Sequence, residues 1–168
     1  DKIHSELGAT LVDQIPWPVI AEIETGSDCD IGKCSFCTEP IKSKVQFRKT
    51  KDVVDEMKEL HKKGVKHFRF GKQTCFYSFQ NGDLKEIEIL LKSASGLNPE
   101  TLHIDNVNPN KVITENGKKI TELIVKYCTP GNVVAFGIES FDPIVVKANW
   151  LNTAPIVAHK AIQIINKY

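Results

Sequence analysis

Apolar and polar positions along the chain follow two different periods in alternation. Longer stretches repeat apolar residues every three or four positions, the spacing of one helix face, and predict helices over residues 50–64, 83–95, 117–128 and 154–168. Short apolar runs rich in β-branched residues predict strands over residues 18–25, 65–71, 100–107 and 132–140. We therefore expect four strand–helix units in succession.

This alternation predicts an α/β fold built on a parallel sheet with right-handed crossovers. Four βα units are half of those in a closed TIM-type barrel, so we expect a half or partial barrel whose strands are buried on both faces. The sequence ends on a helix, where a fifth strand would be expected. We predict a single partial core domain over residues 1–168, in which residues 1–17 lead into the barrel and the remainder of the barrel lies beyond residue 168. That remainder, or a second half-barrel chain, is expected to cover the open sheet edge.

Composition narrows the class of protein. The chain has 168 residues, of which 41% are hydrophobic, enough for the core of one domain. Its 22 basic and 21 acidic residues leave a net charge of +1, which argues against a broad nucleic-acid footprint. No apolar run approaches the roughly 18 residues that span a membrane, and residues 1–14 lack a signal-peptide pattern. A cytoplasmic location without membrane contact is expected.

Three of the five cysteines lie in the loop after the first predicted strand, SDCDIGKCSFCTEP (residues 27–40). Clustered cysteines in an intracellular chain more often bind metal or carry out redox chemistry than form disulfides. Cys34 and Cys37 can direct two thiolates at one centre from a single turn, and Gly32 allows the reversal that brings Cys29 to it. Three thiolates fall short of a structural zinc site, but on a four-iron cluster they leave one iron open for a substrate or cofactor.

Inert thiols and a zinc site are the alternatives for this loop. Cys75, just after the second predicted strand, could complete a four-thiolate site for zinc or for a closed electron-transfer cluster, or it could simply be buried. Cys128, at the end of a predicted helix, is expected to be structural.

Ligands of such folds bind at the carboxyl ends of the parallel strands. The four predicted strands are followed by the cysteine loop, GKQTC, DNVNP and ESFD. We predict that the cysteine loop, Gly71 and Glu139 meet on one face. Asp105 is the expected substrate or cofactor contact after the third strand, with turn formation as the alternative. Arg69 lies within a strand and is expected to face the barrel interior and to pair with Asp105 or Glu139.

A three-cysteine loop after the first strand of a βα barrel, with an aromatic residue before the last cysteine (CSFC), resembles the radical S-adenosylmethionine (radical SAM) superfamily. The wider string of AEIETG, CSFCTEP, FRFGKQ, LHIDNVNP and FGIES is similar to a poorly characterised, archaeal-type group of these proteins. The resemblance implies that Cys29, Cys34 and Cys37 hold a 4Fe–4S cluster whose fourth iron binds S-adenosylmethionine. It also implies an external electron donor of the reductase, ferredoxin or flavodoxin type. The implied reaction is reductive cleavage to a 5′-deoxyadenosyl radical, which abstracts hydrogen from a substrate that the sequence does not identify.

The resemblance further implies cofactor contacts at the first two strand ends. Phe36 would lie against the adenine side of S-adenosylmethionine. Gly71, Lys72 and Gln73 stand where the superfamily has a Gly-Gly-Glu-like stretch that meets the methionyl amine. The carboxylate is missing here, so the side-chain oxygen of Gln73 or a backbone carbonyl would accept that hydrogen bond.

The fourth strand end is expected to meet the ribose. Glu139 or Ser140 would take this role, because a carboxylate can accept two hydrogen bonds from a diol. A salt bridge between Glu139 and Lys72 is the alternative. The loop departs from the commonest superfamily spacing by one extra residue between Cys29 and Cys34. The alternative for the whole chain is a non-catalytic iron–sulfur or zinc module for electron transfer or partner binding.

Overall fold

The computed structural model describes residues 2–30, 34–42, 44–71 and 73–168. The strands are β1 (Ile20–Glu24), β2 (Gly26–Ser27), β3 (Gln46–Phe47), β4 (His67–Gly71), β5 (Thr101–Ile104), β6 (Asn106–Val107) and β7 (Ala135–Phe136). The α-helices are α1 (Lys2–Ala9), α2 (Glu39–Lys42), α3 (Thr50–Lys62), α4 (Leu84–Ser95), α5 (Pro109–Val112), α6 (Glu115–Tyr127), α7 (Pro143–Ala148) and α8 (Pro155–Ile165). The 3₁₀ helices are η1 (Thr10–Gln14) and η2 (Phe76–Gly82).

The main sheet is parallel, in the order β1-β4-β5. Glu24 pairs with Gly71, and Phe70 pairs with Ile104, so the three strands end at the same edge. β6 follows β5 after one intervening residue and pairs in parallel with β7. The predicted α/β fold of alternating βα units is confirmed, and over the described residues it is a partial barrel that does not close.

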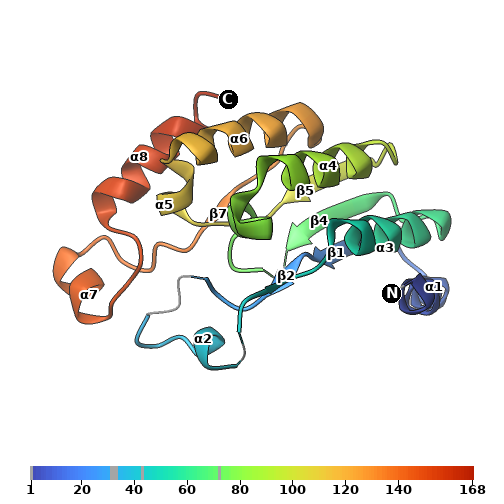
Figure 1. Ribbon diagram of the computed structural model, residues 1–168, viewed down its shortest axis with the longest axis horizontal. Helices are drawn as coiled ribbons and strands as arrows, with labels where there is room; N and C mark the ends of the chain where they lie inside the picture. Colours follow the sequence, from blue (N-terminus) through green and yellow to red (C-terminus); the bar gives the residue numbers. More distant parts are fainter. Residues whose placement is uncertain (1, 31–33, 43, 72) are drawn as a thin grey trace.

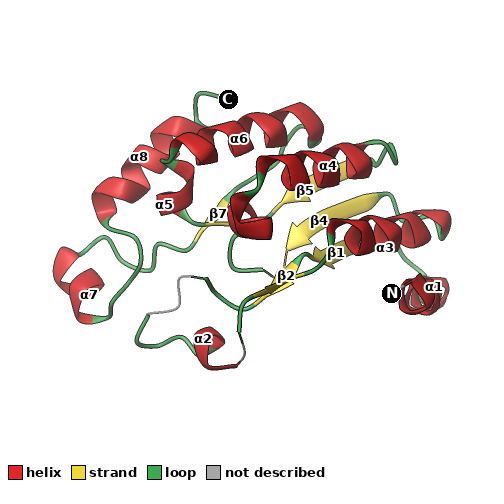
Figure 2. Cartoon of the chain, in the orientation of Figure 1, coloured by secondary structure: helices red, strands yellow, loops and turns green. Residues whose placement is uncertain are grey.

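The helices cover one face of this sheet. Alternate strand residues are buried beneath them, namely Ala21, Ile23, Phe68, Phe70, Leu102 and Ile104. Figure 2 shows α3, α4, α6 and α8 together on this side of the strands. The intervening residues, such as Glu22 and Arg69, are exposed on the opposite face. The prediction of burial on both faces is wrong, because no element within the described ranges covers this second face.

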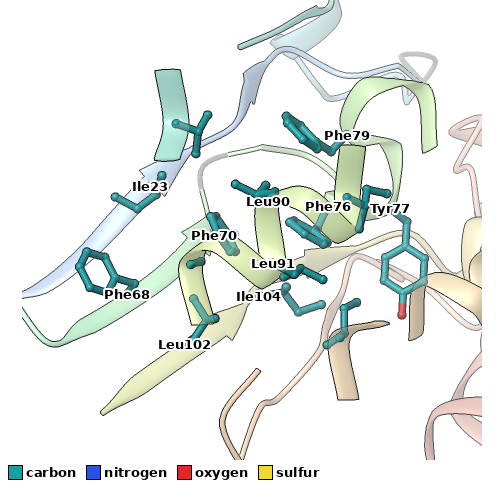
Figure 3. Close-up of a cluster of buried hydrophobic side chains, with 14 of the residues drawn as sticks. Ile23, Phe68, Phe70, Phe76, Tyr77, Phe79, Leu90, Leu91, Leu102 and Ile104 are labelled. Carbon is teal, nitrogen blue, oxygen red and sulfur yellow. The ribbon is translucent and has the colours of Figure 1, made fainter. Parts of the chain in front are cut away.

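The core fills the space between the sheet and the helices. Phe70 of β4 lies beside Leu90 and Leu91 of α4 (Figure 3), and Phe68 of the same strand is buried in the same core cluster. Phe76 of η2 stacks on Phe70 with the ring centroids 5.5 Å apart. Each large apolar side chain buried in this way contributes about 1.5–3 kcal/mol to the free energy of unfolding. This core holds the carboxyl ends of β1, β4 and β5 in fixed positions relative to one another.

The fourth strand is shorter than predicted. β7 covers only Ala135–Phe136 of the expected residues 132–140. Before it, side chains take the place of strand backbone. Thr129 Oγ1 accepts a hydrogen bond from the Leu102 amide (2.9 Å), and Asn132 Oδ1 accepts one from the Ile104 amide (3.0 Å). Since these two β5 donors are already satisfied, the chain lies along β5 without forming a backbone ladder there.

Several short elements were not predicted, because they span too few residues to show a period. α1 packs beside α3, at the opposite end of the molecule from α7 (Figure 1). β2 and β3 pair antiparallel, Gly26 with Phe47, and join the two ends of the segment that carries the cysteines. None of the helices in the described part of the chain combines the length and apolar character needed to cross a membrane.

Candidate functional site

The segments that follow β1, β4 and β5 contact one another at the carboxyl edge of the sheet. Thr74 Oγ1, after β4, donates a hydrogen bond to the Asp28 carbonyl of the cysteine loop (3.1 Å). Asn106 Nδ2, in β6, donates to the Gln73 carbonyl (3.1 Å). β7 pairs with β6, so residues 137–140 leave the sheet at this edge as well. The cysteine loop and the predicted cofactor segments therefore lie at one edge of the sheet.

Cys34 and Cys37 stand on a single turn, as their spacing predicted. The Cys37 amide donates to the Cys34 carbonyl (3.1 Å), which closes the turn. Both thiols are half-buried, as is Cys29, and all five cysteines are described without a disulfide. No group of three His, Cys, Asp or Glu side chains within the described residues lies close enough to hold a metal ion. The three-cysteine ligand set therefore stays a prediction, supported by the chemistry of the donors.

The turn between these cysteines is anchored to the helix that follows β7. The Ser35 amide donates to the Asn149 carbonyl (3.0 Å), and Ser35 Oγ donates to Asn149 Oδ1 (3.0 Å). Asn149 is the residue that ends α7. Phe36, the predicted adenine contact, lies in the same turn and is 60% exposed. An exposed aromatic ring beside the thiols offers a flat apolar surface for a planar base.

Gly71 and Gln73 occupy the end of β4, whereas Lys72 lies outside the described residues. Gly71 is buried, and a Cβ placed on it would lie 2.8 Å from Cδ of Glu22 on β1. A larger residue at this position would displace the Glu22 side chain. The Glu22 side chain therefore lies over the Gly71 backbone, in the space that a Cβ at residue 71 would occupy.

Gln73 is 5% exposed, and neither its Nε2 nor its Oε1 has a hydrogen-bond partner among the described residues. Leaving a buried amide without a hydrogen bond lowers the free energy of unfolding by about 1–3 kcal/mol. Such a group is therefore expected to bond to water or to a ligand. Oε1 can accept a hydrogen bond from an amine, which is the role predicted for this position. The amide is the acceptor type that the predicted role requires, and a contact of Gln73 with S-adenosylmethionine stays a prediction.

The open face of the sheet carries an ion-pair network. Arg69 Nη2 lies 3.1 Å from Glu22 Oε2, and Arg69 Nη1 lies 3.7 Å from Asp105 Oδ2. Arg69 lies on the face opposite the helices, as predicted, and of its two predicted partners, Asp105 and Glu139, it pairs with Asp105. Glu22 was missed as a partner, although it alternates with the buried Ala21 and Ile23 and so had to face the same side as Arg69.

Glu139 and Ser140 follow β7 in an irregular segment that leads into α7. Glu139 has a backbone φ of +62°, an uncommon conformation for a residue with a side chain, and it is exposed. Ser140 Oγ accepts a hydrogen bond from the Asp142 amide (3.1 Å), and the Asp142 carboxylate caps α7. The proposed salt bridge to Lys72 involves a residue outside the described ranges, so both interpretations of Glu139 stay predictions.

The remaining cysteines have the environment of structural residues. Cys75 is packed in the hydrophobic core, and its Sγ accepts a hydrogen bond from the Asn108 amide (3.3 Å). Burial raises the pKa of the Cys75 thiol. Burial also raises the pKa of Cys128, to about 12. A metal ligand must lose its proton, so both environments oppose ligation.

These environments predict a pattern of thiol reactivity. In the metal-free, reduced protein at pH 8, iodoacetamide should modify Cys29, Cys34 and Cys37 first. Buried Cys75 should react only after unfolding, and half-buried Cys128, whose pKa is raised, should react more slowly than the three loop cysteines. Alkylation requires an accessible thiolate, and burial disfavours the thiolate at the last two positions. Peptide mass spectrometry over a time course measures each site, with urea-unfolded protein as the control. Native Cys75 or Cys128 reacting as fast as Cys34 would contradict the assignment.

The chain is similar to a known protein family and to proteins of two archaea. The family model described as the radical SAM superfamily matches residues 23–163. An uncharacterized protein of Methanocaldococcus jannaschii, MJ0274, is 42% identical over 179 residues, covering 95% of this chain and 33% of that protein. An uncharacterized protein of Archaeoglobus fulgidus is 44% identical over 176 residues, covering 96% of this chain and 33% of that protein. The chain thus spans about a third of the length of these relatives.

Solved structures of the cobalamin-dependent S-adenosylmethionine radical enzyme OxsB share the fold. The apo form has a TM-score of 0.72 at 16% identity and covers 92% of this chain and 23% of OxsB. The form with aqua-cobalamin bound has a TM-score of 0.66 at 14% identity and covers 86% of this chain and 22% of OxsB. With the family match over most of its length, the chain belongs to the radical SAM superfamily.

Proposed function

We propose that this chain is the cluster-binding part of a radical SAM enzyme. Cys29, Cys34 and Cys37 would hold a 4Fe–4S cluster with one open iron for S-adenosylmethionine. The observation that carries the proposal is the place of the three-cysteine loop at the carboxyl end of the first parallel strand. The loop contacts the segment after β4, and that segment in turn contacts β6, which follows β5. In a βα fold this edge is where ligands bind.

When bound, the cluster supplies an electron for cleavage of S-adenosylmethionine to methionine and a 5′-deoxyadenosyl radical, which takes hydrogen from a substrate. The protein's own residues would bind and orient the cofactor. The Gln73 side-chain amide, which has no hydrogen-bond partner among the described residues, would accept a hydrogen bond from the methionyl amine through Oε1, in place of the carboxylate usual in the superfamily. Phe36 would pack against the adenine, and Glu139 or Ser140 would accept hydrogen bonds from the ribose hydroxyls.

The open sheet face is the proposed substrate side. It presents Arg69, which forms ion pairs with both Glu22 and Asp105. The three side chains remain accessible to a ligand. Asp105 ends this network at the same edge as the cysteine loop, so it is the proposed first contact for substrate or cofactor. The reductant would be an external electron donor of the reductase, ferredoxin or flavodoxin type. A cytoplasmic location is proposed, because thiols stay reduced there.

Anaerobic reconstitution tests cluster binding. With iron and sulfide, the chain should turn brown and hold about four irons and four sulfides, the content of one such cluster. Adding S-adenosylmethionine should change the electron paramagnetic resonance spectrum of the reduced protein, because the cofactor binds the open iron. The Cys75→Ala variant should behave alike, since Cys75 is not a proposed ligand. A colourless protein with one tightly held zinc per chain would support the non-catalytic zinc module instead.

A further inference from the structure

Asp30, the residue after Cys29, connects the cysteine loop to two later parts of the fold. Its Oδ2 accepts a hydrogen bond from Ser78 Oγ of η2 (2.8 Å) and lies 3.1 Å from Lys111 Nζ of α5. The Asp30 side chain is 22% exposed, so this contact is partly shielded from water. We call the contact of these three side chains the Asp30 latch. It joins the first βα unit to the second and the third.

The partners of Asp30 are themselves held in place. Ser78 is buried in η2, next to the core aromatics Tyr77 and Phe79. Lys111 lies in α5, which packs tightly on α6. A Cβ added to Gly117 of α6 would lie 2.8 Å from the Lys111 carbonyl carbon. The latch therefore fixes the Asp30 carboxylate to a rigid part of the molecule, and an ion pair between ordered, partly buried groups is stronger than one on an open surface.

Two further contacts hold the loop on either side of the latch. The Asp28 carbonyl accepts from Thr74 Oγ1 (3.1 Å), and the Ser35 amide donates to the Asn149 carbonyl (3.0 Å). None of these contacts uses a thiol. The described parts of the cysteine loop are thus positioned by the second, third and fourth βα units, independently of any metal.

We propose that Asp30, Ser78 and Lys111 are positioning residues that present Cys29 to the iron–sulfur cluster. The proposal rests on the proposed function, in which Cys29 is a ligand. Lys111 also neutralises the Asp30 carboxylate one residue away from that ligand. Because the charge near a cluster helps to set its reduction potential, the latch orients the loop and balances the local charge at the same time.

Alkylation of the metal-free protein tests whether the Asp30 latch holds Cys29 in place. Lys111→Met and Asp30→Asn should each make Cys29 react about five- to tenfold faster with iodoacetamide, because loss of one charged contact weakens the closed loop by about 1 kcal/mol or more. Lys118→Met is the matched control, since Lys118 is exposed to a similar extent and its ion pair among the described residues is with Glu115 of the same helix, α6. Lys111→Arg should restore the wild-type rate. Equal rates of Cys29 alkylation in wild type, Lys111→Met and Asp30→Asn would show that the Asp30 latch does not hold Cys29 in place.

The loaded protein tests positioning at the cluster. Both variants should release iron to a chelator about tenfold faster than wild type. Their reduction potentials should shift in opposite directions. Lys111→Met removes a positive charge and lowers the potential, whereas Asp30→Asn removes a negative charge and raises it. Shifts of the same sign, or none, would overturn the charge-balancing role. A wild-type chain that takes up no iron would contradict the proposed function. The alkylation rates of the metal-free protein would still test whether the Asp30 latch holds Cys29.

Discussion

Replacing Cys34 by alanine is expected to abolish the iron–sulfur cluster. The variant should lose the brown colour, fall to background iron content, and form 5′-deoxyadenosine at least about 100-fold more slowly than wild type. Loss of a residue that only supports a metal ligand already costs about 10–100-fold, and removal of a ligand itself exceeds that. Iron analysis, the visible spectrum and product chromatography under anaerobic conditions measure the three effects.

The fold should survive this substitution. Cys34 is half-buried in a surface turn whose hydrogen bond uses its backbone carbonyl, which alanine keeps. The melting temperature of the metal-free variant should therefore match that of wild type. Cys128→Ala is the matched control, because it removes a thiol of raised pKa that is not a proposed ligand. A Cys34→Ala protein with four irons, or a Cys128→Ala protein with none, would exclude the proposed ligand set.

Phe68→Ala is expected to lower the free energy of unfolding by about 3–5 kcal/mol. Phe68 is fully buried in the middle strand β4, where its ring packs into the core between the sheet and the helices (Figure 3). Alanine would leave a cavity that the paired strands on both sides cannot collapse to fill. Urea unfolding followed by circular dichroism measures the change.

Phe141→Ala serves as the control for this prediction. Phe141 is 60% exposed in the segment before α7, so the same chemical change should alter the unfolding free energy by less than about 0.5 kcal/mol. Comparable losses in the two variants would show that Phe68 does not lie in a closed core.

The helices and the first three strands follow from the sequence, because each has a clear period and a buried face. The helix predicted over residues 50–64 forms at Thr50–Lys62, and the strand predicted over residues 65–71 forms at His67–Gly71. The fourth strand was overestimated, because the side chains of Thr129 and Asn132 satisfy donors of β5 that a strand would otherwise bond. The spacing of apolar residues does not indicate where a side chain, instead of a strand backbone, accepts the hydrogen bonds of a neighbouring strand.

The candidate site was predictable where its chemistry is local. The spacing of Cys34 and Cys37 indicated one turn. The position of Arg69 in a strand indicated a carboxylate partner, Asp105 or Glu139, and the structure has Asp105 in that role. The Asp30 latch was not predictable, because Asp30 and Ser78 stand 48 residues apart and meet only through the packing of η2 and α5 on the loop. Contacts of this kind depend on the complete tertiary arrangement.

Reductive cleavage of S-adenosylmethionine by the reconstituted chain tests the proposed function most directly. The protein is reduced with dithionite under anaerobic conditions, S-adenosylmethionine is added, and the products are separated by chromatography. The expected products are 5′-deoxyadenosine and methionine in equal amounts, formed at a rate that falls to background in the Cys34→Ala variant. A chain that holds a reduced four-iron cluster and returns S-adenosylmethionine intact would contradict the proposed function.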